Sequence, residues 1–269
     1  MGDTAPHPNP LPVKDGEREP TEQPRIAVLI PTLNEEKSIG DLIARIPRDL
    51  VSRIIVADGG SRDATIDCAR SAGAEVIAAG SGYGRACLAA AKTAADSEIL
   101  VFMDGDGADD PRAIPALVQP ILAGKQDFVI GSRARGRRAP GSIAWHQLAA
   151  GFLAGAGIRL LYGVRYTDMC AFRAIRREAL LGLGMREPTY GWNIEMQMRA
   201  AAAGLRILEI PVDYHCRTGG TSKVAGTVRG SIKAGARILM TFARVALSPH
   251  DRKRVKGGAK GALLHCLRL

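Results

Sequence analysis

Short apolar runs alternate with segments of helical spacing between residues 25 and 132. In chain order the runs are RIAVLIP, RIIVA, AEVIAA, EILVFM and DFVIGS. Runs of this length and composition are typical of buried strands, and the segments between them have the apolar spacing of helices. Regular alternation with short links predicts the α/β fold class, with a mostly parallel, Rossmann-like sheet flanked by helices.

Longer segments follow this alternating region. Residues 142–164 form a mostly apolar helix, for which a core position and a position on a membrane face are equally supported. A helix over 191–204 and a strand over 205–216 come next. The last helix, over 227–246, separates apolar residues from Arg229, Lys233, Arg237 and Arg244. Such a basic amphipathic helix suits an anionic membrane surface, or it docks on the protein with its charged side in solvent.

The two ends of the sequence differ from its middle. Residues 1–24 are rich in proline and charge, which predicts a disordered N-terminal tail. One folded domain is expected over 25–247, and residues 248–269 are expected to form a basic C-terminal tail. We find no signal peptide and no apolar stretch of membrane-spanning length. The five scattered cysteines suit a reducing compartment, so the features together predict a cytoplasmic protein.

The net charge of +10 has its source at the C-terminal end. Residues 217–269 contain 12 Lys or Arg and one acid, which gives +11 and leaves −1 for the rest of the chain. Nucleic acid, anionic lipid or a phosphorylated substrate would each complement this charge. Nucleic acid is the remote alternative, because the segment has few aromatic side chains for stacking and the acidic loops would have no role.

Polar segments follow four of the predicted strands. They are PTLNEE, DGGSRDAT, DGDGADD and GSRARGRR. Because the carboxyl ends of parallel strands meet at one edge of a sheet, these segments are expected to outline a single cleft. Arg85 lies in a further loop, GSGYGRA, and could neutralise a phosphate, although this loop lacks the lysine of a nucleoside-triphosphate-binding loop.

Asp104 and Asp106 follow the fourth strand at a spacing that points both side chains the same way in an extended segment. Two carboxylates together with substrate phosphates are a common ligand set for Mg²⁺, so we expect Mg²⁺ or Mn²⁺ to bind here with a diphosphate. Asp58 follows the second strand and could accept hydrogen bonds from a ribose or a base. Helix capping accounts for Asp63 but leaves Asp58 without a local role.

Seven segments in order resemble glycosyltransferase family 2, which has the GT-A fold, and within it the dolichol- or polyprenyl-phosphate sugar transferases. The segments are IPTLNEE (30–36), DGGSRDAT (58–65), MDGDGADDP (103–111), GSR (131–133), DMCAFRA (168–174), GWNIEM (191–196) and RTGGTSK (217–223). The resemblance implies metal-dependent transfer of a sugar from a UDP- or GDP-sugar to a polyprenyl phosphate, with inversion. It also implies a position at the cytoplasmic face of a membrane.

The resemblance also implies roles for individual residues. Nucleotide-sugar contacts would come from Pro31, Asn34, Glu35 and Asp58, with Asp104 and Asp106 holding the metal and the diphosphate. Arg133 would bind the acceptor phosphate. The segment containing Arg217, Ser222 and Lys223 would close over the phosphates, with Arg217 or Lys223 stabilising the leaving group. Glu195 falls where relatives place an acid near the sugar, although a structural role on its helix is the alternative.

The nature of the acceptor decides whether a general base is needed. A lipid phosphate is already ionised near neutral pH and needs arginines to position it, whereas a hydroxyl would need a base, for which Glu195 or Asp168 is the candidate. Two departures from the family motifs weigh against a lipid acceptor. Gly59 stands where a second Asp is common, and Ala108 stands where the lipid-phosphate branch often has Gln. A soluble hydroxyl or a phosphorylated small molecule is therefore the alternative acceptor.

Overall fold

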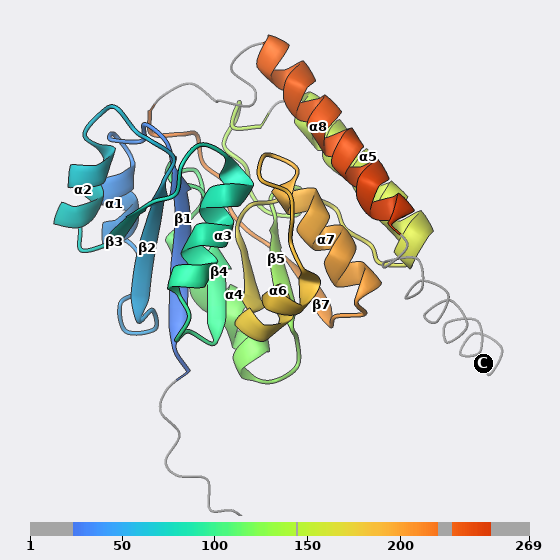
Figure 1. Cartoon of the computed structure of the whole chain (residues 1–269), viewed down its shortest axis with the longest axis horizontal. Coiled ribbons are helices and arrows are strands. Elements are labelled where there is room, and N and C mark those ends of the chain that lie inside the picture. Colours follow the sequence, from blue (N-terminus) through green and yellow to red (C-terminus); the bar gives the residue numbers. More distant parts are fainter. Residues whose placement is uncertain (1–23, 144, 220–227, 249–269) are drawn as a thin grey trace, which may run out of the picture.

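The computed structural model describes residues 24–143, 145–219 and 228–248 (Figure 1). A seven-stranded sheet with the order β3-β2-β1-β4-β6-β5-β7 forms its centre. The strands are β1 (Ile26–Thr32), β2 (Arg53–Asp58), β3 (Glu75–Ala78), β4 (Ile99–Phe102), β5 (Phe128–Ser132), β6 (Arg173–Arg176) and β7 (Ile207–Pro211). The main helices are α1 (Ile39–Ala44), α2 (Thr65–Ser71), α3 (Tyr83–Thr93), α4 (Ile114–Leu122), α5 (Trp145–Tyr162), α6 (Arg177–Leu183), α7 (Trp192–Ala202) and α8 (Val228–Leu247).

The mostly parallel α/β sheet predicted from the apolar runs is confirmed. β1, β2, β3 and β4 are parallel neighbours, and β5 is parallel to β7. Every residue of β1 and β4 is buried, as expected for parallel strands with both faces covered. The sequence analysis missed β6, which runs antiparallel between β4 and β5. Its four residues, RAIR, are too few and too polar to be recognised as a strand.

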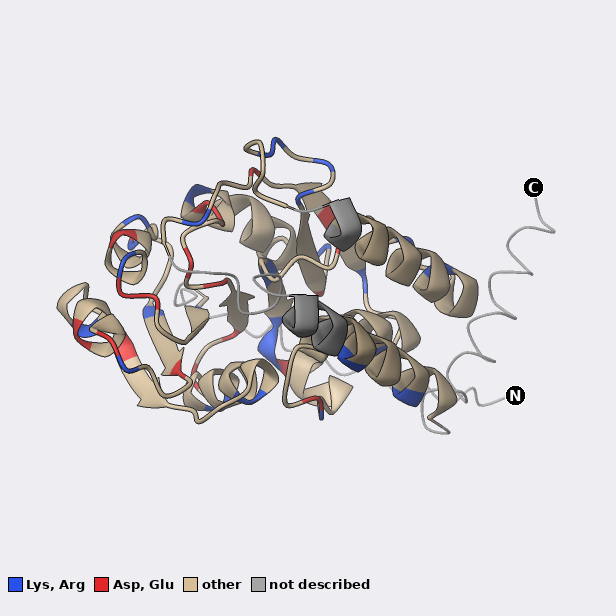
Figure 2. Ribbon diagram, turned by 90° about the horizontal axis from the view of Figure 1, so that it is seen from above, with Lys and Arg blue, Asp and Glu red and all other residues tan. Residues whose placement is uncertain are grey.

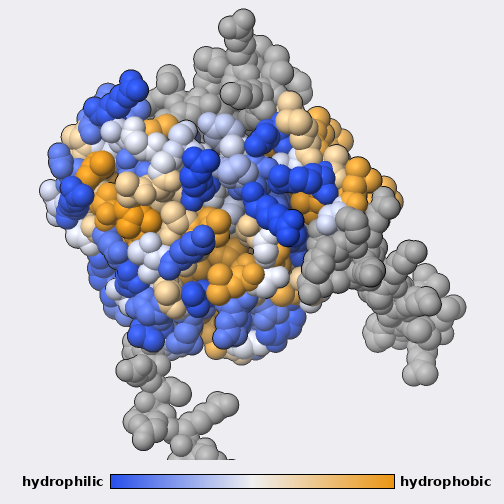
Figure 3. All heavy atoms as spheres, in the orientation of Figure 1, coloured by the Kyte–Doolittle hydropathy of each residue, from blue (hydrophilic) through white to orange (hydrophobic). Residues whose placement is uncertain are grey.

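Helices α5 and α8 lie side by side at one edge of the molecule, next to α7 (Figures 1 and 2). Hydrophobic atoms are visible at this edge in the space-filling view (Figure 3). No helix in the described part of the chain is long and apolar enough to cross a membrane. The predicted N-terminal tail and nearly all of the predicted C-terminal tail fall outside the described residues, so both remain predictions.

The predicted C-terminal helix spans Val228–Leu247. Arg237 and Arg244 pair with the buried Glu187, while their side chains stay 41% and 50% exposed. The charged side expected in solvent is thus partly solvated, and it also pairs with the protein. The side chains of Arg229 and Lys233 lie outside the described set.

Candidate active site

Three of the polar segments meet at the carboxyl edge of the sheet, as predicted. Ser38 Oγ donates a hydrogen bond of 2.8 Å to the Gly105 carbonyl, which joins the loop after β1 to the loop after β4. The backbone N–H of Glu35 donates to Thr65 Oγ1 at 2.7 Å, which joins the loops after β1 and β2. Figure 2 shows acidic residues on the loops at this edge of the sheet. The parallel order of β4, β1 and β2 is what brings the three loops together.

Asp104, Asp106 and Asp109 form an acidic cluster within the loop after β4. Asp106 is 1% exposed, and its Oδ1 accepts a hydrogen bond from the Ala108 N–H. Its Oδ2 is buried and, among the described residues, accepts no directed hydrogen bond. Asp104 accepts a hydrogen bond of 3.1 Å from the Tyr83 hydroxyl, and its backbone N–H donates to Asp109 Oδ2 at 3.3 Å. The loop thus holds three carboxylates within a short span of backbone.

Burial and mutual repulsion raise the pKa values of two carboxylates in the acidic cluster. Burial, followed by the charge of Asp106, raises the pKa of Asp104 to about 6. Burial, followed by the charges of Asp104 and Asp106, also raises the pKa of Asp109 well above its ordinary value. The cluster therefore has an excess of negative charge, which a divalent cation with oxygen ligands would relieve.

The residues present fit a metal that is completed by substrate. No group of three or more His, Cys, Asp or Glu placed to hold a metal occurs in the part of the chain that the structure describes. Two carboxylates, Asp104 and Asp106, would therefore supply the protein ligands, and the remaining ligands would come from diphosphate and water, as is usual for Mg²⁺. Asp106 Oδ2 is buried and accepts no directed hydrogen bond among the described residues, so it is available as a metal ligand.

Arg217 is the cation that contacts this cluster. Its Nη2 lies 2.7 Å from Asp106 Oδ2, at an angle that makes an ion pair without a directed hydrogen bond, and its Nη1 lies 3.9 Å from Glu35 Oε1. The segment around Arg217 is fixed along the acidic loop, because the Thr218 N–H donates to the Asp106 carbonyl and the His215 N–H to that of Ala108. Ser222 and Lys223, predicted to act with Arg217, lie outside the described residues.

The residues predicted for the nucleotide occupy different environments. Asn34 and Glu35 line a hollow that also includes Asp63 and Gly219, which places them beside the Arg217 segment. Pro31 is buried inside β1. Arg85 is exposed, and its guanidinium donates to the carbonyl of Ser81 in its own loop.

Asp58 has a local role that the sequence analysis did not assign to it. Its carboxylate is buried and accepts hydrogen bonds from the backbone of Gly60 and from the backbone and hydroxyl of Ser61. These bonds hold the turn after β2. Ser61 Oγ in turn accepts a hydrogen bond from the Asn34 N–H, so the turn supports the nucleotide-side loop. Contact of Asp58 with a nucleotide remains a prediction.

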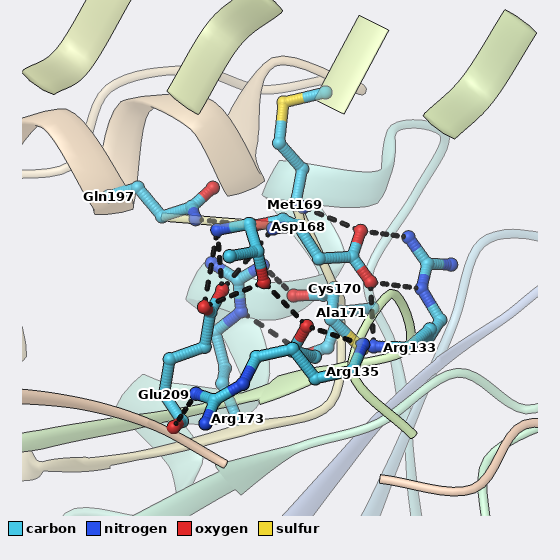
Figure 4. A network of polar contacts seen from close by, with 11 residues as sticks. Arg133, Arg135, Asp168, Met169, Cys170, Ala171, Arg173, Gln197 and Glu209 are labelled. Atoms are coloured by element: carbon cyan, nitrogen blue, oxygen red, sulfur yellow. Dashed lines mark hydrogen bonds and ion pairs between the residues drawn. The ribbon is translucent and has the colours of Figure 1, made fainter. Parts of the chain in front are cut away.

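Arg133 and Asp168 form a bidentate ion pair (Figure 4). Arg133 Nε donates to Asp168 Oδ2 at 2.8 Å, and Arg133 Nη2 donates to Asp168 Oδ1 at 2.8 Å. The backbone N–H of Arg133 also donates to this carboxylate. The guanidinium stacks 5.0 Å from the centre of the Tyr214 ring. The pair engages one edge of the guanidinium and leaves Nη1 outside it. Arg133 is thus held in one orientation, close to the acidic cluster through the pairing of Tyr214 with Asp109.

The surroundings of Asp168 fit it to hold the Arg133 guanidinium in place and make its carboxylate a weak base. Its backbone N–H donates to Glu209, and its carbonyl accepts from Gln197 Nε2 (Figure 4). Burial favours the neutral acid, but the hydrogen bonds and the charge of Arg133 outweigh it and lower the pKa of Asp168. A carboxylate with a lowered pKa and both oxygens engaged is poorly suited to accept a proton. The structure therefore disfavours Asp168 as the base.

Glu195 lies on α7 and is fully buried. One carboxylate oxygen accepts hydrogen bonds from the backbone N–H groups of Arg186 and Glu187, and the other accepts from Arg199 Nε at 3.1 Å. These contacts fix the chain before α7. Of the two roles that the sequence left open, the structural one is favoured, because the carboxylate has no exposed surface in this state.

Two aromatic residues that contact the site were missed from the sequence. Tyr83 begins α3 and donates to Asp104, and Tyr214 stacks on Arg133. Tyr83 belongs to GSGYGRA, the loop from which the sequence analysis chose Arg85. A tyrosine two residues before a candidate arginine was a usable signal, whereas nothing near Tyr214 in the sequence indicates its partner.

The sheet with its acid-bearing loop and facing arginines has the architecture of a GT-A glycosyltransferase. A family model described as "Glycosyl transferase family 2" matches residues 27–184, more than half of the chain. The chain therefore belongs to glycosyltransferase family 2 and is a glycosyltransferase.

Particular relatives narrow this assignment. An uncharacterised glycosyltransferase of Mycobacterium tuberculosis is 37% identical over 212 residues, covering 78% of this chain and 94% of the relative. An undecaprenyl-phosphate mannosyltransferase of Micrococcus luteus is 31% identical over 226 residues, covering 77% of this chain and 90% of the relative. Relatives of this kind are consistent with the polyprenyl-phosphate sugar transferase branch.

Solved structures confirm the GT-A fold. Glucosyl-3-phosphoglycerate synthase of Mycobacterium tuberculosis, in complex with phosphoglyceric acid, superposes with a TM-score of 0.65 and 25% identity over 81% of this chain and 79% of that protein. The same enzyme has also been crystallised with Mn²⁺, UDP and its product. At 24% identity and a TM-score of 0.64, that second likeness concerns the fold alone.

Proposed function

We propose that this protein transfers a sugar from a nucleoside-diphosphate sugar to a polyprenyl phosphate in a reaction that needs Mg²⁺ or Mn²⁺. Binding of the nucleotide-sugar donor is supported by the contacts of Arg217 with Asp106 and Glu35 at the carboxyl edge of the sheet. The acceptor half is supported by the undecaprenyl-phosphate mannosyltransferase relative and by the clamped Arg133.

The donor would bind across the acidic loop. Asp104 and Asp106 would hold the metal, which when bound supplies a Lewis acid that neutralises the diphosphate. Arg217 pairs with Asp106, and a diphosphate would offer it a stronger anionic partner. In this proposal Arg217 turns from Asp106 to the diphosphate and stabilises the charge that grows on the leaving group. Asn34 and Glu35 would line the nucleoside side.

The acceptor phosphate would be oriented by Arg133. Asp168 holds two donors of the guanidinium and so directs Nη1 away from the pair, where it can meet a phosphate oxygen. One acceptor oxygen then bonds to the anomeric carbon as the bond from that carbon to the diphosphate breaks, with inversion. The acceptor is already ionised, so no protein base is required, which agrees with the engaged state of both Asp168 and Glu195.

A soluble phosphorylated acceptor is the second candidate. It is favoured by the structural likeness to glucosyl-3-phosphoglycerate synthase, whose complex contains phosphoglyceric acid. Both candidates have a phosphate that Arg133 could position, but a lipid phosphate attacks through its own oxygen, whereas a phosphorylated small molecule that attacks through a hydroxyl would need a base. A position in the cytoplasm, with peripheral attachment to a membrane, accompanies the lipid candidate and is part of the proposal.

A parallel transfer assay tests the proposal. The full-length protein would be incubated with labelled UDP- and GDP-sugars, Mg²⁺ or Mn²⁺, and either undecaprenyl phosphate in detergent or phosphoglyceric acid. We expect label in the organic phase, dependent on metal and lost on chelation. Label that appears only with the soluble acceptor would establish the second candidate. No transfer to either acceptor from any donor would refute both acceptor assignments.

A further inference from the structure

The outer surfaces of α5 and α8 are apolar. Six large hydrophobic side chains with between 57% and 87% exposure lie on these two helices, out of eight exposed large hydrophobics in the described chain. We call this surface the α5/α8 face, formed by Phe152, Leu153 and Leu160 of α5 and Leu239, Met240 and Leu247 of α8. Exposed hydrophobics that gather on one surface mark an interaction site, whereas scattered ones do not.

Both helices carry large apolar residues on their outer side in addition to the core contacts that Ile158 and Val245 make on their inner side. On α5 the inward side carries Gly151 and Gly155, and a Cβ on Gly155 would collide with the Tyr166 carbonyl. On α8 the inward side carries polar residues, since Arg237, Thr241 and Arg244 all bond to the buried Glu187. A helix with water outside normally turns its large apolar residues inward and its charges outward. Large apolar side chains on the outer side as well suit a low-dielectric surrounding there.

The two helices present one continuous surface. They run side by side in both ribbon views (Figures 1 and 2), and a Cβ on Gly157 of α5 would meet the ring of Phe242 of α8. In the space-filling view, hydrophobic atoms appear at the edge of the molecule where these helices lie (Figure 3). The exposed stripes lie opposite the inward contacts of each helix, so both face away from the protein.

Charge decides between the partners that could cover this face. In the sequence, α8 is followed within 13 residues by Arg252, Lys253, Arg254, Lys256 and Lys260 against one acid, Asp251. A second copy of the chain would bring an equal positive charge to the same contact and be repelled. An anionic lipid surface complements both the apolar stripe and the adjoining cations, which is the pattern of helices that lie in a membrane interface.

The face adjoins the residues assigned to the acceptor. Gly151 of α5 lies against the backbone of Asp168, and Asp168 holds Arg133 in its bidentate pair. A polyprenyl phosphate has its chain in the bilayer and its phosphate at the surface. An enzyme resting on the α5/α8 face would have Arg133 near the level of that phosphate. The acceptor could then be bound without leaving the bilayer.

We infer that the α5/α8 face docks on an anionic lipid bilayer and positions Arg133 at the level of the lipid phosphates. The inference rests on the proposed function for the identity of the acceptor, but the docking itself is measured without any transfer. Full-length protein is floated with vesicles of phosphatidylcholine and phosphatidylglycerol at about 0.15 M salt, where the Debye length is about 8 Å. The wild type should float with these vesicles and not with phosphatidylcholine alone.

A double variant, Leu160→Gln with Leu239→Gln, removes one large apolar group from each helix. We expect its partitioning to fall at least about tenfold, because each leucine loses most of its transfer into the acyl region. The matched control is Leu181→Gln, an exposed leucine on α6 away from the face, which should float like the wild type. All three side chains are already exposed, so thermal melting should be unchanged and a folding defect would be visible.

Transfer to a water-soluble, short-chain polyprenyl phosphate separates the docking inference from the proposed function. The double variant should keep this activity, because neither leucine contacts the site, while it loses transfer to undecaprenyl phosphate in vesicles. If the wild type transfers sugar to the short acceptor but floats no better than the double variant, the docking inference fails alone. If flotation depends on the leucines but no phosphate acceptor is glycosylated, the proposed function fails alone. A wild-type dimer that the double variant converts to monomer, without flotation, would assign the face to a second copy.

Discussion

Two clusters of buried acids and arginines in this molecule have opposite electrostatic balance. The first is the acidic loop after β4, and the second lies between α7 and α8. Both combine buried or half-buried carboxylates with arginines from distant parts of the sequence. Their members are Asp104, Asp106, Asp109 and Arg217 in the first cluster, and Glu187, Glu195, Arg199, Arg237 and Arg244 in the second.

The second cluster satisfies its acids and the first does not. Glu187 accepts hydrogen bonds from Thr189, Arg237, Thr241 and Arg244. Burial alone would raise the pKa of Glu187, but the hydrogen bonds from Thr189 and Arg237 help to lower it. In the acidic loop, burial and repulsion raise the pKa of Asp104 instead. Unpaired buried charge costs free energy, so its retention at the sheet edge indicates a ligand that offsets it.

The largest effect is expected from Asp106→Asn. This change removes a proposed metal ligand and the partner of Arg217, and we expect transfer to fall by roughly 10²–10³-fold. Stability should hardly change, because loss of the Arg217 pair is offset by relief of repulsion among the three acids. Initial rates and thermal melting of the same preparations check both parts. A variant with unimpaired transfer, also after chelation, would remove the acidic loop from the mechanism.

Glu187→Gln should show the reverse pattern. It breaks a satisfied buried cluster, removes the carboxylate that pairs with Arg237 and leaves Arg244 with its longer 3.8 Å contact to Glu195, at a cost of about 2 kcal/mol in the free energy of unfolding. The rate per folded molecule should stay close to that of the wild type. Denaturant unfolding gives the first quantity, and transfer assays below the melting temperature give the second. The exposed Glu98→Gln is the control, and an equal loss of stability in both variants would contradict the argument.

The stability contributed by Glu187 should depend on pH in a defined direction. Its folded-state pKa lies below the ordinary value of 4.5, so the folded protein holds the proton less tightly than the unfolded chain does. The contribution is complete above pH 4.5 and is lost as pH falls toward the lowered value. The stability gap between wild type and Glu187→Gln should therefore be constant from pH 7 to about 5 and narrow below about 4.5. A gap that instead widens on acidification would reverse the assigned shift.

The sequence predicted the fold well where burial alone decides it. Continuous apolar runs located β1 to β5, and the position of Asp104 and Asp106 after β4 followed from the run that precedes them. β6 was missed because Arg173 is completely buried there, bonded to the carbonyls of Cys170, Ala171 and Asn193 and close to the Phe128 ring. A search for periodic hydrophobic residues cannot detect a strand in which one of the buried side chains is an arginine.

The roles of individual carboxylates were less predictable than their positions. Residue type and spacing placed Asp58, Asp168 and Glu195 as candidates, but the partners that engage them come from their own turn, from 35 residues away and from a neighbouring loop. Periodicity likewise showed that α8 has two faces, and it could not show which one is inward. That choice depends on the core contact of Val245 and on Glu187, which is distant in sequence.

Asp168→Asn should separate the clamp from a base. The amide places an N–H₂ group against one donor of Arg133, so the bidentate pair is lost and the guanidinium is no longer held in one orientation. We expect KM for the acceptor phosphate to rise about tenfold, with kcat less affected and KM for the donor unchanged. Steady-state kinetics with each substrate varied in turn distinguish the roles. A fall of 10²–10⁴-fold in kcat at constant KM would identify a base.

Tyr83→Phe should give the smallest effect, a modest loss of nucleoside-diphosphate affinity, and it tests the role of Asp104 directly. The hydroxyl donates to Asp104 Oδ1, and this bond opposes the rise in the pKa of that carboxylate. Its loss leaves Asp104 less inclined to be charged and less well oriented, so Mn²⁺-dependent binding of a nucleoside diphosphate should weaken about threefold to tenfold, as expected for one hydrogen bond to a charged group. Calorimetric titration measures this without turnover. Tyr190→Phe is the matched control on an exposed tyrosine, and an equal affinity in the two variants would show that Asp104 does not need the hydroxyl.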